Sequence, residues 1–385
     1  MAFYLAIKEF WRARGRFLLF SLVIALITML VLLVAALGTG LADANRQFID
    51  KLDADLLVVQ EDNDLVLTTS RLDRQTLNGV RRINGVEAAG LIAFSNGSVL
   101  LPAGSEAEDI DVSLVGIEPG QLGAPELLAG QPLRDRYADQ VLLDERLAAD
   151  LAVSIGDRIT LRTVQGAEQE SFELTVSGIT EERAYFFAPS VYLPLYTWEK
   201  VRPQAVGGGD GQPIGNLIVV TLTDPSQTEL ISARVLELVD GVEVADKETL
   251  VRAQPGYTAQ QTTVEAQRGF ALVIGVLVVG GFFQIQTLQK LPQIGMLKAI
   301  GIANRTVALS TLAQIVIVTA VGVALGTAVT LLMALGIPPV VPLRFTPPNM
   351  LAAIAALMLI GPIGGMVSVR LAVRIEPLSA IAQGK

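Results

Sequence analysis

Residues 290–305 read KLPQIGMLKAIGIANR, and this short basic stretch lies between two long uncharged apolar segments. Leu291 precedes Pro292, an order that favours one extended residue followed by the first turn of a helix. Residues 293–300 then suffice for about two helical turns. Gly301 is placed to end them as the first residue beyond the helix, where a left-handed backbone is common. The stretch therefore predicts a short helix between two apolar segments.

The expected helix is amphipathic. Ile294, Leu297 and Gly301 fall on one side at helical spacing, with Lys298 beside them. We expect this helix to lie at a membrane surface, where a soluble motor protein could bind it. Leu297 and Ile294 would then be the apolar anchors of the interface, and Lys298 would meet acidic groups at its rim.

Four apolar segments are long enough to cross a membrane. About 20 residues at 1.5 Å rise each span a hydrocarbon core of about 30 Å. Because there are four such segments and the mean hydropathy of the chain is positive, buried helices of a soluble protein are the weaker interpretation. The uncharged runs are residues 17–38, 269–289, 306–343 and 345–369.

These segments predict the fold class and the division of the chain. We expect an α-helical membrane protein with four transmembrane helices and a large extracytoplasmic α+β domain inserted between helices 1 and 2. The predicted parts are a cytoplasmic N-terminus with helix 1 (1–40), the external domain (41–268, with a strand-rich insert at about 95–205), helix 2 (269–289), a cytoplasmic loop (290–305), helix 3 (306–335), an external turn (336–349), helix 4 (350–369) and a cytoplasmic tail (370–385).

Basic residues in the short flanks predict the orientation. Residues 1–16 contain four basic residues and one acidic residue. Residues 290–305 contain three basic residues and no acidic residue, and residues 370–385 contain three basic residues and one acidic residue. All three flanks lie on one side of a chain with four spans. The positive-inside rule therefore puts both termini and the short loop in the cytoplasm, at a bacterial plasma membrane. The first span is longer than the apolar region of a typical signal peptide, so we expect a retained anchor.

The chain contains no histidine and no cysteine, which limits its chemistry. A Ser-His-Asp arrangement, a cysteine nucleophile, an ordinary zinc site and disulfides are thereby excluded. No G-x-x-x-x-G-K-[ST] phosphate loop occurs, and the glycine-rich run 207–211 is typical of a flexible linker. Residues 41–268 carry 36 acidic and 18 basic residues, and this net charge of −18 argues against nucleic acid as a partner. We expect no catalytic residue, metal site or cofactor site.

A short internal sequence repeat, the NGVEAA and DGVEVA echo, occurs near the two ends of the external domain. Residues 84–89 (NGVEAA) follow a predicted helix at 73–83, and residues 240–245 (DGVEVA) follow another at 227–238. Both helices follow a hydrophobic strand. We favour a duplicated β-α-β unit, although N-G and D-G turns are common in themselves. The predicted strands are 55–60, 65–69, 86–94, 110–117, 158–161, 172–177, 191–193 and 217–222.

The predicted order of elements resembles that of the FtsX-like permease family. One span is followed by a large external α+β domain and then by three further spans, with a basic loop after the second span. This family provides the membrane subunits of MacB-, LolC- and DevC-type ABC systems, and the resemblance covers essentially the whole chain. Its most specific parts are 297–301 (LKAIG) and 374–381 (RIEPLSAI). Within the family, residues 287–295 and 40–55 look similar to those of HrtB-type haem-export permeases.

The resemblance implies a transport subunit that is not itself an enzyme. A separate ABC ATPase would bind ATP and magnesium, and a second permease copy would complete a dimer. Membrane lipid and a membrane-fusion or other accessory protein are further implied partners. The coupling helix of the family maps onto Pro292, Gln293, Ile294, Gly295, Met296, Leu297, Lys298, Ala299, Ile300 and Gly301.

The resemblance also implies outward movement of a hydrophobic or amphipathic substrate by transmission of motion across the membrane. Haem is the specific candidate; lipids, glycolipids, drugs and peptides stay open. Without His or Cys, a haem ligand would be Tyr, Met or a carboxylate, so intramembrane Met29 and membrane-proximal Tyr257 are the candidate substrate residues. The alternative function is a mechanotransmitter that regulates an extracytoplasmic enzyme such as a cell-wall hydrolase. A membrane-anchored receptor without an ATPase is a third.

Overall fold

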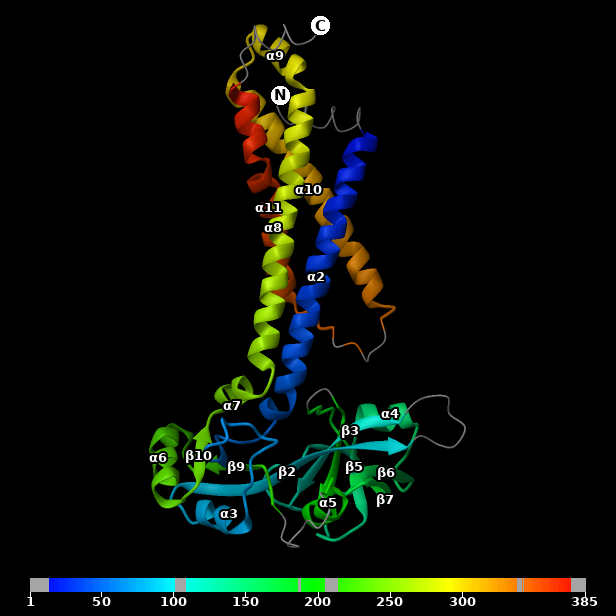
Figure 1. Cartoon of the computed structure of the whole chain (residues 1–385), viewed down its shortest axis with the longest axis vertical. Coiled ribbons are helices and arrows are strands. Elements are labelled where there is room, and N and C mark those ends of the chain that lie inside the picture. Colours follow the sequence, from blue (N-terminus) through cyan, green and yellow to red (C-terminus); the bar gives the residue numbers. More distant parts are fainter. Residues whose placement is uncertain are drawn as a thin grey trace. The chain divides into compact units, whose positions relative to one another are not determined.

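The computed structural model describes residues 14–100, 109–185, 188–204, 214–337, 341 and 343–374 (Figure 1). The chain divides into two compact units, one of Met1–Leu41 with Ala259–Lys385 and one of Ala42–Thr258. Residues 1–13 of the basic flank, the glycine-rich run 207–211 and residues 375–385, which hold most of the RIEPLSAI motif, lie outside the described residues.

In its described residues, the first unit contains four helices that are long and apolar enough to cross a membrane. Because a large α+β domain separates the first of them from the second, the predicted fold class is confirmed. The first two helices are longer than the uncharged runs that predict them, since each continues into the chain of the second unit. The bounds are α2 (Arg14–Asp50), α8 (Tyr257–Gln289), α10 (Asn304–Ala334) and α11 (Pro347–Arg374), with the short helix α9 (Leu291–Ala299) between α8 and α10.

Glycines let α2 and α10 pack closely. A Cβ atom added at Gly322 would lie 2.6 Å from the Cβ of Ile24, and one added at Gly326 would lie 2.5 Å from the carbonyl oxygen of Ala25. Neither position has room for a side chain. Gly322-x-x-x-Gly326 is therefore a contact surface of the kind that small residues form between helices in membranes.

The described part of the second unit is organised around a ten-stranded sheet. At one end the strands lie in the order β10-β1-β9-β2, and each is antiparallel to its neighbour. Helix α3 (Arg74–Arg81) connects β1 to β2, and α6 (Thr228–Leu238) connects β9 to β10. Each β-α-β unit thus holds a strand of the other unit between its own two strands, which is the split β-α-β arrangement. The duplication predicted from the NGVEAA and DGVEVA echo is confirmed. These strands are β1 (Leu56–Gln60), β2 (Val86–Leu100), β9 (Leu217–Leu222) and β10 (Val242–Ala245).

The other strands lie between the two β-α-β units in the chain. The sheet continues from β2 in the order β3-β8-β5-β7-β4, and β6 pairs with both β2 and β7. Three helices of seven residues, α4, α5 and α7, are missing from the sequence-based prediction, because about two turns show little periodicity. The bounds are β3 (Ile110–Ile117), β4 (Leu127–Gly130), β5 (Gln140–Asp144), α4 (Glu145–Leu151), β6 (Arg158–Gln165), β7 (Glu168–Thr180), β8 (Ser190–Pro194), α5 (Leu195–Val201) and α7 (Lys247–Ala253).

The two faces of this sheet are covered by different elements. Side chains alternate along a strand, so Leu56 and Val58 of β1 enter the core that contains buried residues of α3 and α6. Leu57 and Val59 enter a second core, which contains Phe48 and Ile49 from the last turns of α2, Leu52 just beyond it, and buried residues of α7. The first transmembrane helix therefore ends inside the hydrophobic core of the domain.

The strand predicted at 65–69 is wrong. These residues form turns, and Asp64 and Leu65 adopt left-handed backbone angles of φ 54° and 59°. The Asn63 side chain accepts a hydrogen bond from the Val66 amide at 2.9 Å, which stabilises the turn. The apolar residues that suggested a strand are explained by Leu67, which is fully buried in the second core.

Candidate functional site

The helix predicted between the second and third spans is α9, Leu291–Ala299. It begins one residue earlier than expected: Leu291 is helical, and Pro292 follows it within the first turn. The expectation of an extended Leu291 is wrong because the preceding helix ends only at Gln289, so the chain turns at Lys290 and re-enters a helix at once.

The end of α9 is a Schellman motif. Gly301 has φ +91°, the left-handed conformation that glycine adopts without strain. Its amide donates to the carbonyl of Lys298 at 3.0 Å, and the amide of Ile302 donates to that of Leu297 at 3.1 Å. The predicted role of Gly301 as the residue that ends this helix is confirmed.

Ile294 faces the protein, which corrects its predicted role as an exposed anchor. It is 8% exposed and packs in a small cluster with Ile302 and Val307. Gly295 beside it is also buried. The short loop after Gly301 folds back, so that its first apolar residue and the start of α10 cover this side of α9. Ile294 therefore fixes α9 to α10.

Apolar residues cover the outer side of α9 instead. Met296 is 63% exposed, Leu297 36% and Ile300 73%. Ile300, at the C-cap, comes three residues after Leu297 and four after Met296, so these side chains form one exposed apolar row at the end of the helix. The sequence analysis includes Met296 and Ile300 in the coupling helix but names only Leu297 and Ile294 as its apolar anchors. The signal for the other two was present in the spacing, since Met296 and Ile300 are four residues apart.

Lys298 also differs from its prediction. Its ammonium donates to the carbonyl oxygen of Val373 at 2.6 Å, near the C-terminal end of α11, where carbonyls have no partner within the helix. Burial lowers the pKa of Lys298. This side chain therefore connects α9 to α11 and does not project as a charge at the rim of a docking surface.

A second lysine fixes the other end of α9. The Lys290 ammonium donates to the Gln314 side-chain oxygen at 3.3 Å and lies over the Phe17 ring, 5.7 Å from its centroid. Gln314 belongs to α10 and Phe17 to α2. Through Lys290 and Lys298, α9 is thus attached to three of the four long helices and is continuous with the fourth, α8.

The two residues considered for substrate binding belong to different units. Met29 lies half-buried on α2 in the helical unit, whereas Tyr257 starts α8 and packs against the second core of the domain. Among the described residues there is no group of three or more His, Cys, Asp or Glu side chains that could hold a metal ion. A haem site at Met29 and Tyr257 stays a proposal.

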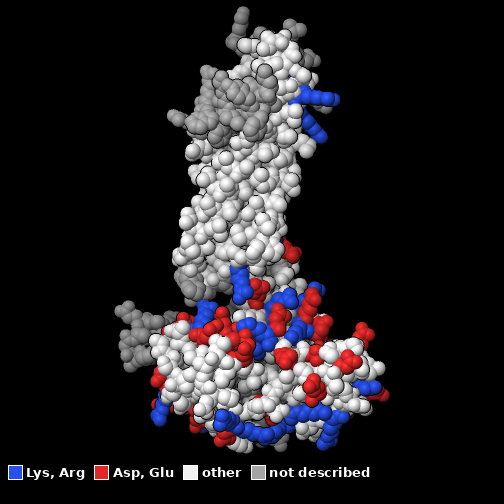
Figure 2. Space-filling view, turned by 180° about the vertical axis from the view of Figure 1, so that it is seen from behind, with Lys and Arg blue, Asp and Glu red and all other residues white. Residues whose placement is uncertain are grey.

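Charge is distributed unevenly between the two units. Figure 2 shows the described surface of the helical unit almost free of charged side chains between its ends, whereas acidic and basic residues crowd the surface of the second unit. This agrees with hydrocarbon around the helices and water around the domain.

Two protein families match the chain. Residues 17–238 match the family described as MacB-like periplasmic core domain, and residues 269–377 match the FtsX-like permease C-terminal family. The putative hemin transport system permease protein HrtB of Staphylococcus haemolyticus is 24% identical over 98% of both chains. The protein of the same name from Staphylococcus epidermidis is 24% identical over 99% of both.

Solved structures resemble the domain at low identity. The extracellular domain of the noncanonic ABC-type transporter YknZ from Gram-positive bacteria gives a TM-score of 0.37 at 14% identity, covering 50% of this chain and 99% of that one. The periplasmic region of MacB from Actinobacillus actinomycetemcomitans gives 0.38 at 14% identity, covering 53% and 94%.

Proposed function

We propose that this chain, which belongs to the FtsX-like permeases with a MacB-like periplasmic core domain, forms the membrane subunit of an export complex whose separate ATPase docks on α9. Membership of this family makes the chain the non-catalytic permease of an ABC-type transporter. The observation that supports the docking site is the exposed apolar row of Met296, Leu297 and Ile300 on a helix attached to the whole bundle.

The proposed mechanism is mechanical. An ATPase that binds the outer side of α9 would move α9 and the long helices as one body. Ile294 packs against α10, Lys290 contacts α10 and α2, and Lys298 contacts α11. Since α2 and α8 continue without interruption into the chain of the domain, motion at α9 reaches the other side of the membrane through helices. No charged residue of the spans is needed to supply energy.

The proposed substrate is hydrophobic or amphipathic, with haem as the specific candidate. The support for haem is the similarity over nearly the full length to proteins named as putative hemin permeases, at 24% identity. We further propose that two copies of the chain form the membrane part, with α9 and both termini in the cytoplasm and Ala42–Thr258 outside it.

The docking proposal is tested with Leu297→Asp. A truncated anchor at the centre of an interface typically costs more than about 2 kcal/mol, or roughly thirtyfold in affinity. We expect Leu297→Asp to abolish co-purification of the partner ATPase from detergent extracts and to abolish export. Met296→Asp and Ile300→Asp should have the same effect. Lys298→Ala should reduce export more than binding, because it breaks the contact with α11.

Ala303→Asp is the matched control. Ala303 is exposed, lies just beyond α9 and precedes the first turn of α10, where an aspartate is a favourable N-cap. It places the same charge at the same membrane surface and should retain the ATPase. Full ATPase binding and export by Leu297→Asp would disprove the docking site.

The substrate is tested on the same purified complex. If haem is exported, haem should stimulate ATP hydrolysis by the wild-type complex and not by the Leu297→Asp preparation. Cells without the permease should be hypersensitive to added haem. If a lipid or a drug but not haem stimulates ATP hydrolysis, the substrate is not haem. The proposed docking site would be unaffected by that result.

A further inference from the structure

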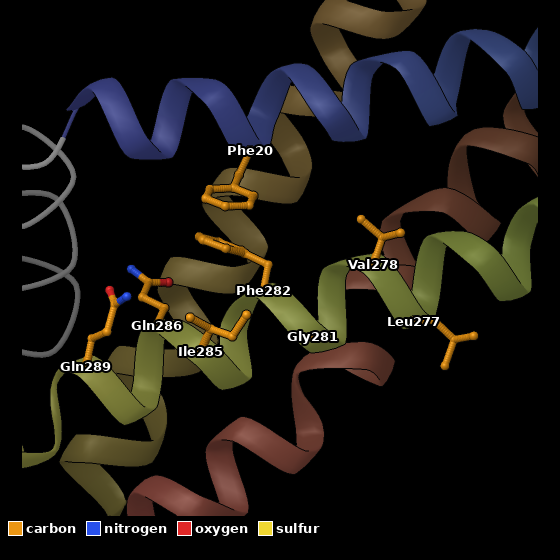
Figure 3. Close-up of a pocket in the computed structure, with 8 residues that line it drawn as sticks. All are labelled: Phe20, Leu277, Val278, Gly281, Phe282, Ile285, Gln286 and Gln289. Atoms are coloured by element: carbon orange, nitrogen blue, oxygen red, sulfur yellow. The ribbon is translucent and has the colours of Figure 1, made fainter.

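A pocket of about 370 Å³ lies in the helical unit between α2 and α8. Figure 3 shows the Phe20 ring of α2 facing the Phe282 ring of α8, and these two rings stack. Most of the lining is apolar, and its polar members are two glutamines near the end of α8. The lining residues are Phe20, Leu277, Val278, Gly281, Phe282, Ile285, Gln286 and Gln289.

Gln286 borders this pocket with an unused hydrogen-bond donor. The residue is only 3% exposed, and its side-chain nitrogen has no acceptor in the described part of the chain. In Figure 3 the Gln286 amide leaves α8 on the side where α2 lies, as does the Phe282 ring. A buried amide N–H without a partner is unusual in folded proteins. A ligand with an acceptor oxygen would supply the missing hydrogen-bond partner.

The pocket follows the axis of α8 from the end of the span inward. From Gln289 to Leu277 the helix rises about 18 Å, at 1.5 Å per residue. This is somewhat more than half of a hydrocarbon core of about 30 Å, or about one leaflet with its interface. The glutamines lie at the surface end, and Leu277 and Val278 lie at the deep end. A ligand that fits is polar at the surface and apolar below it.

Charge at the surface end favours an anion. Lys290 directly follows α8, and the stretch 290–305 also contains Lys298 and Arg305 but no acidic residue. Basic residues next to a transmembrane helix attract anionic headgroups. The same end of the bundle thus offers a donor for an ester or phosphate oxygen and a positive potential for the headgroup.

We propose that this pocket binds one anionic glycerophospholipid from the leaflet on the side of α9. An acyl chain lies along the Phe20–Phe282 pair and reaches Leu277, and an ester or phosphate oxygen accepts the hydrogen bond of Gln286. The lipid fills the space between the first two membrane helices. This site does not depend on the identity of the exported substrate or on the ATPase.

Gly281 provides a specific way to fill the pocket. A Cβ atom added there meets nothing within 4 Å, and Gly281 lines the pocket, so we expect a leucine at this position to occupy part of it. Its neighbour Gly280 is different, because a Cβ there would lie 2.8 Å from the Gly364 carbonyl oxygen of α11. Gly269 is a matched control on the same helix: it too has nothing within 4 Å, but it does not line the pocket.

The experiment uses the full chain in nanodiscs of phosphatidylethanolamine and phosphatidylglycerol. The probe is phosphatidylglycerol with a photoactivatable diazirine in one acyl chain, and labelled peptides are mapped by mass spectrometry. We expect labelling within 277–289. Gly281→Leu should remove it, Gly269→Leu should retain it, and Gln286→Leu should lower it about five- to tenfold, the usual loss for one hydrogen bond in apolar surroundings.

Three results would overturn the proposal. The first is equal labelling of 277–289 in wild type and Gly281→Leu. The second is a disulfide between two copies of Val278→Cys in this cysteine-free chain, which would show that a second copy covers the pocket. The third is displacement of the probe by haem together with loss of export by Gly281→Leu, which would make the pocket a substrate site. Loss of the ATPase in Leu297→Asp affects none of these readings.

Discussion

Gly326 illustrates how a missing side chain holds two membrane helices together. A Cβ there would lie 2.5 Å from the Ala25 carbonyl oxygen and 2.6 Å from the Thr28 Cβ, and a backbone atom cannot move aside as the end of a side chain can. We expect Gly326→Leu to separate α10 from α2, since overpacking costs about 1–3 kcal/mol or more. The measurement is the temperature at which the detergent-solubilised chain loses its monodisperse size-exclusion peak.

Gly269→Leu is the control at this scale, because a Cβ atom added at Gly269 meets nothing within 4 Å. It should leave that temperature unchanged or raise it slightly, since leucine is a better helix former than glycine. Equal stability of the Gly326→Leu and Gly269→Leu chains would show that the α2–α10 contact is not close-packed in the membrane.

At the scale of elements, the C-terminal end of α2 is bound to the domain by polar contacts as well as by its apolar side chains. The Lys51 ammonium lies 2.8 Å from the Glu181 carboxylate, and Arg183 binds the other oxygen of that group. The Lys247 ammonium donates to the carbonyls of Asp50 and Leu52 at the end of α2. The domain therefore holds this helix end from two sides.

This attachment predicts a dependence of stability on pH. Burial opposes the ionisation of Glu181, but hydrogen bonds from Lys51 and Arg183 outweigh it and lower the pKa of this carboxyl. A lowered pKa in the folded state stabilises the fold above the ordinary glutamate pKa of about 4.3, and the gain is lost as the pH falls through the folded value. Lys51→Met should therefore lower the unfolding temperature at pH 7, and this difference should shrink below about pH 4.

The readout is the fluorescence of buried Trp198 during heating, in a Trp11→Phe background. We expect a loss of about 1 kcal/mol at neutral pH, since Lys51 is partly exposed. Lys200→Met is the matched control, because its ion pair with Asp139 is mostly exposed and should contribute little at any pH. A Lys51→Met effect that stays constant down to acid pH would contradict the role of the Glu181 charge.

At the scale of the whole molecule, the orientation in the membrane determines whether α9 can meet a soluble ATPase. The chain has no cysteine, so single cysteines can be placed at Ala303, beyond α9, and at Ala167, in the turn between β6 and β7; both positions are exposed. A membrane-impermeant thiol reagent added to whole cells should label Ala167→Cys and spare Ala303→Cys until the cells are lysed. The reverse pattern would place α9 outside the cell and exclude it as an ATPase site.

The sequence by itself determined the features that depend on composition and local order. In lipid, the backbone polar groups of a long uncharged run find hydrogen-bond partners when the run is helical. The lengths of the four uncharged runs therefore predict the four spans. Gly301 ends α9 because a left-handed residue is needed there, and glycine adopts that conformation without strain. The repeated turn after α3 and α6 predicted two β-α-β units because each copy carries its own strand, helix and turn pattern.

Tertiary structure decided which side of each element is used. An apolar residue at helical spacing has the same pattern whether it faces a core or a partner, so only the fold-back of Ile302 and Val307 shows that Ile294 is internal while Met296 and Ile300 are exposed. The interleaving of the two β-α-β units, the contact of Lys298 with α11 and the unused donor of Gln286 depend on which segments meet. These contacts form between different segments of the chain, and a local sequence pattern does not show which segments come into contact.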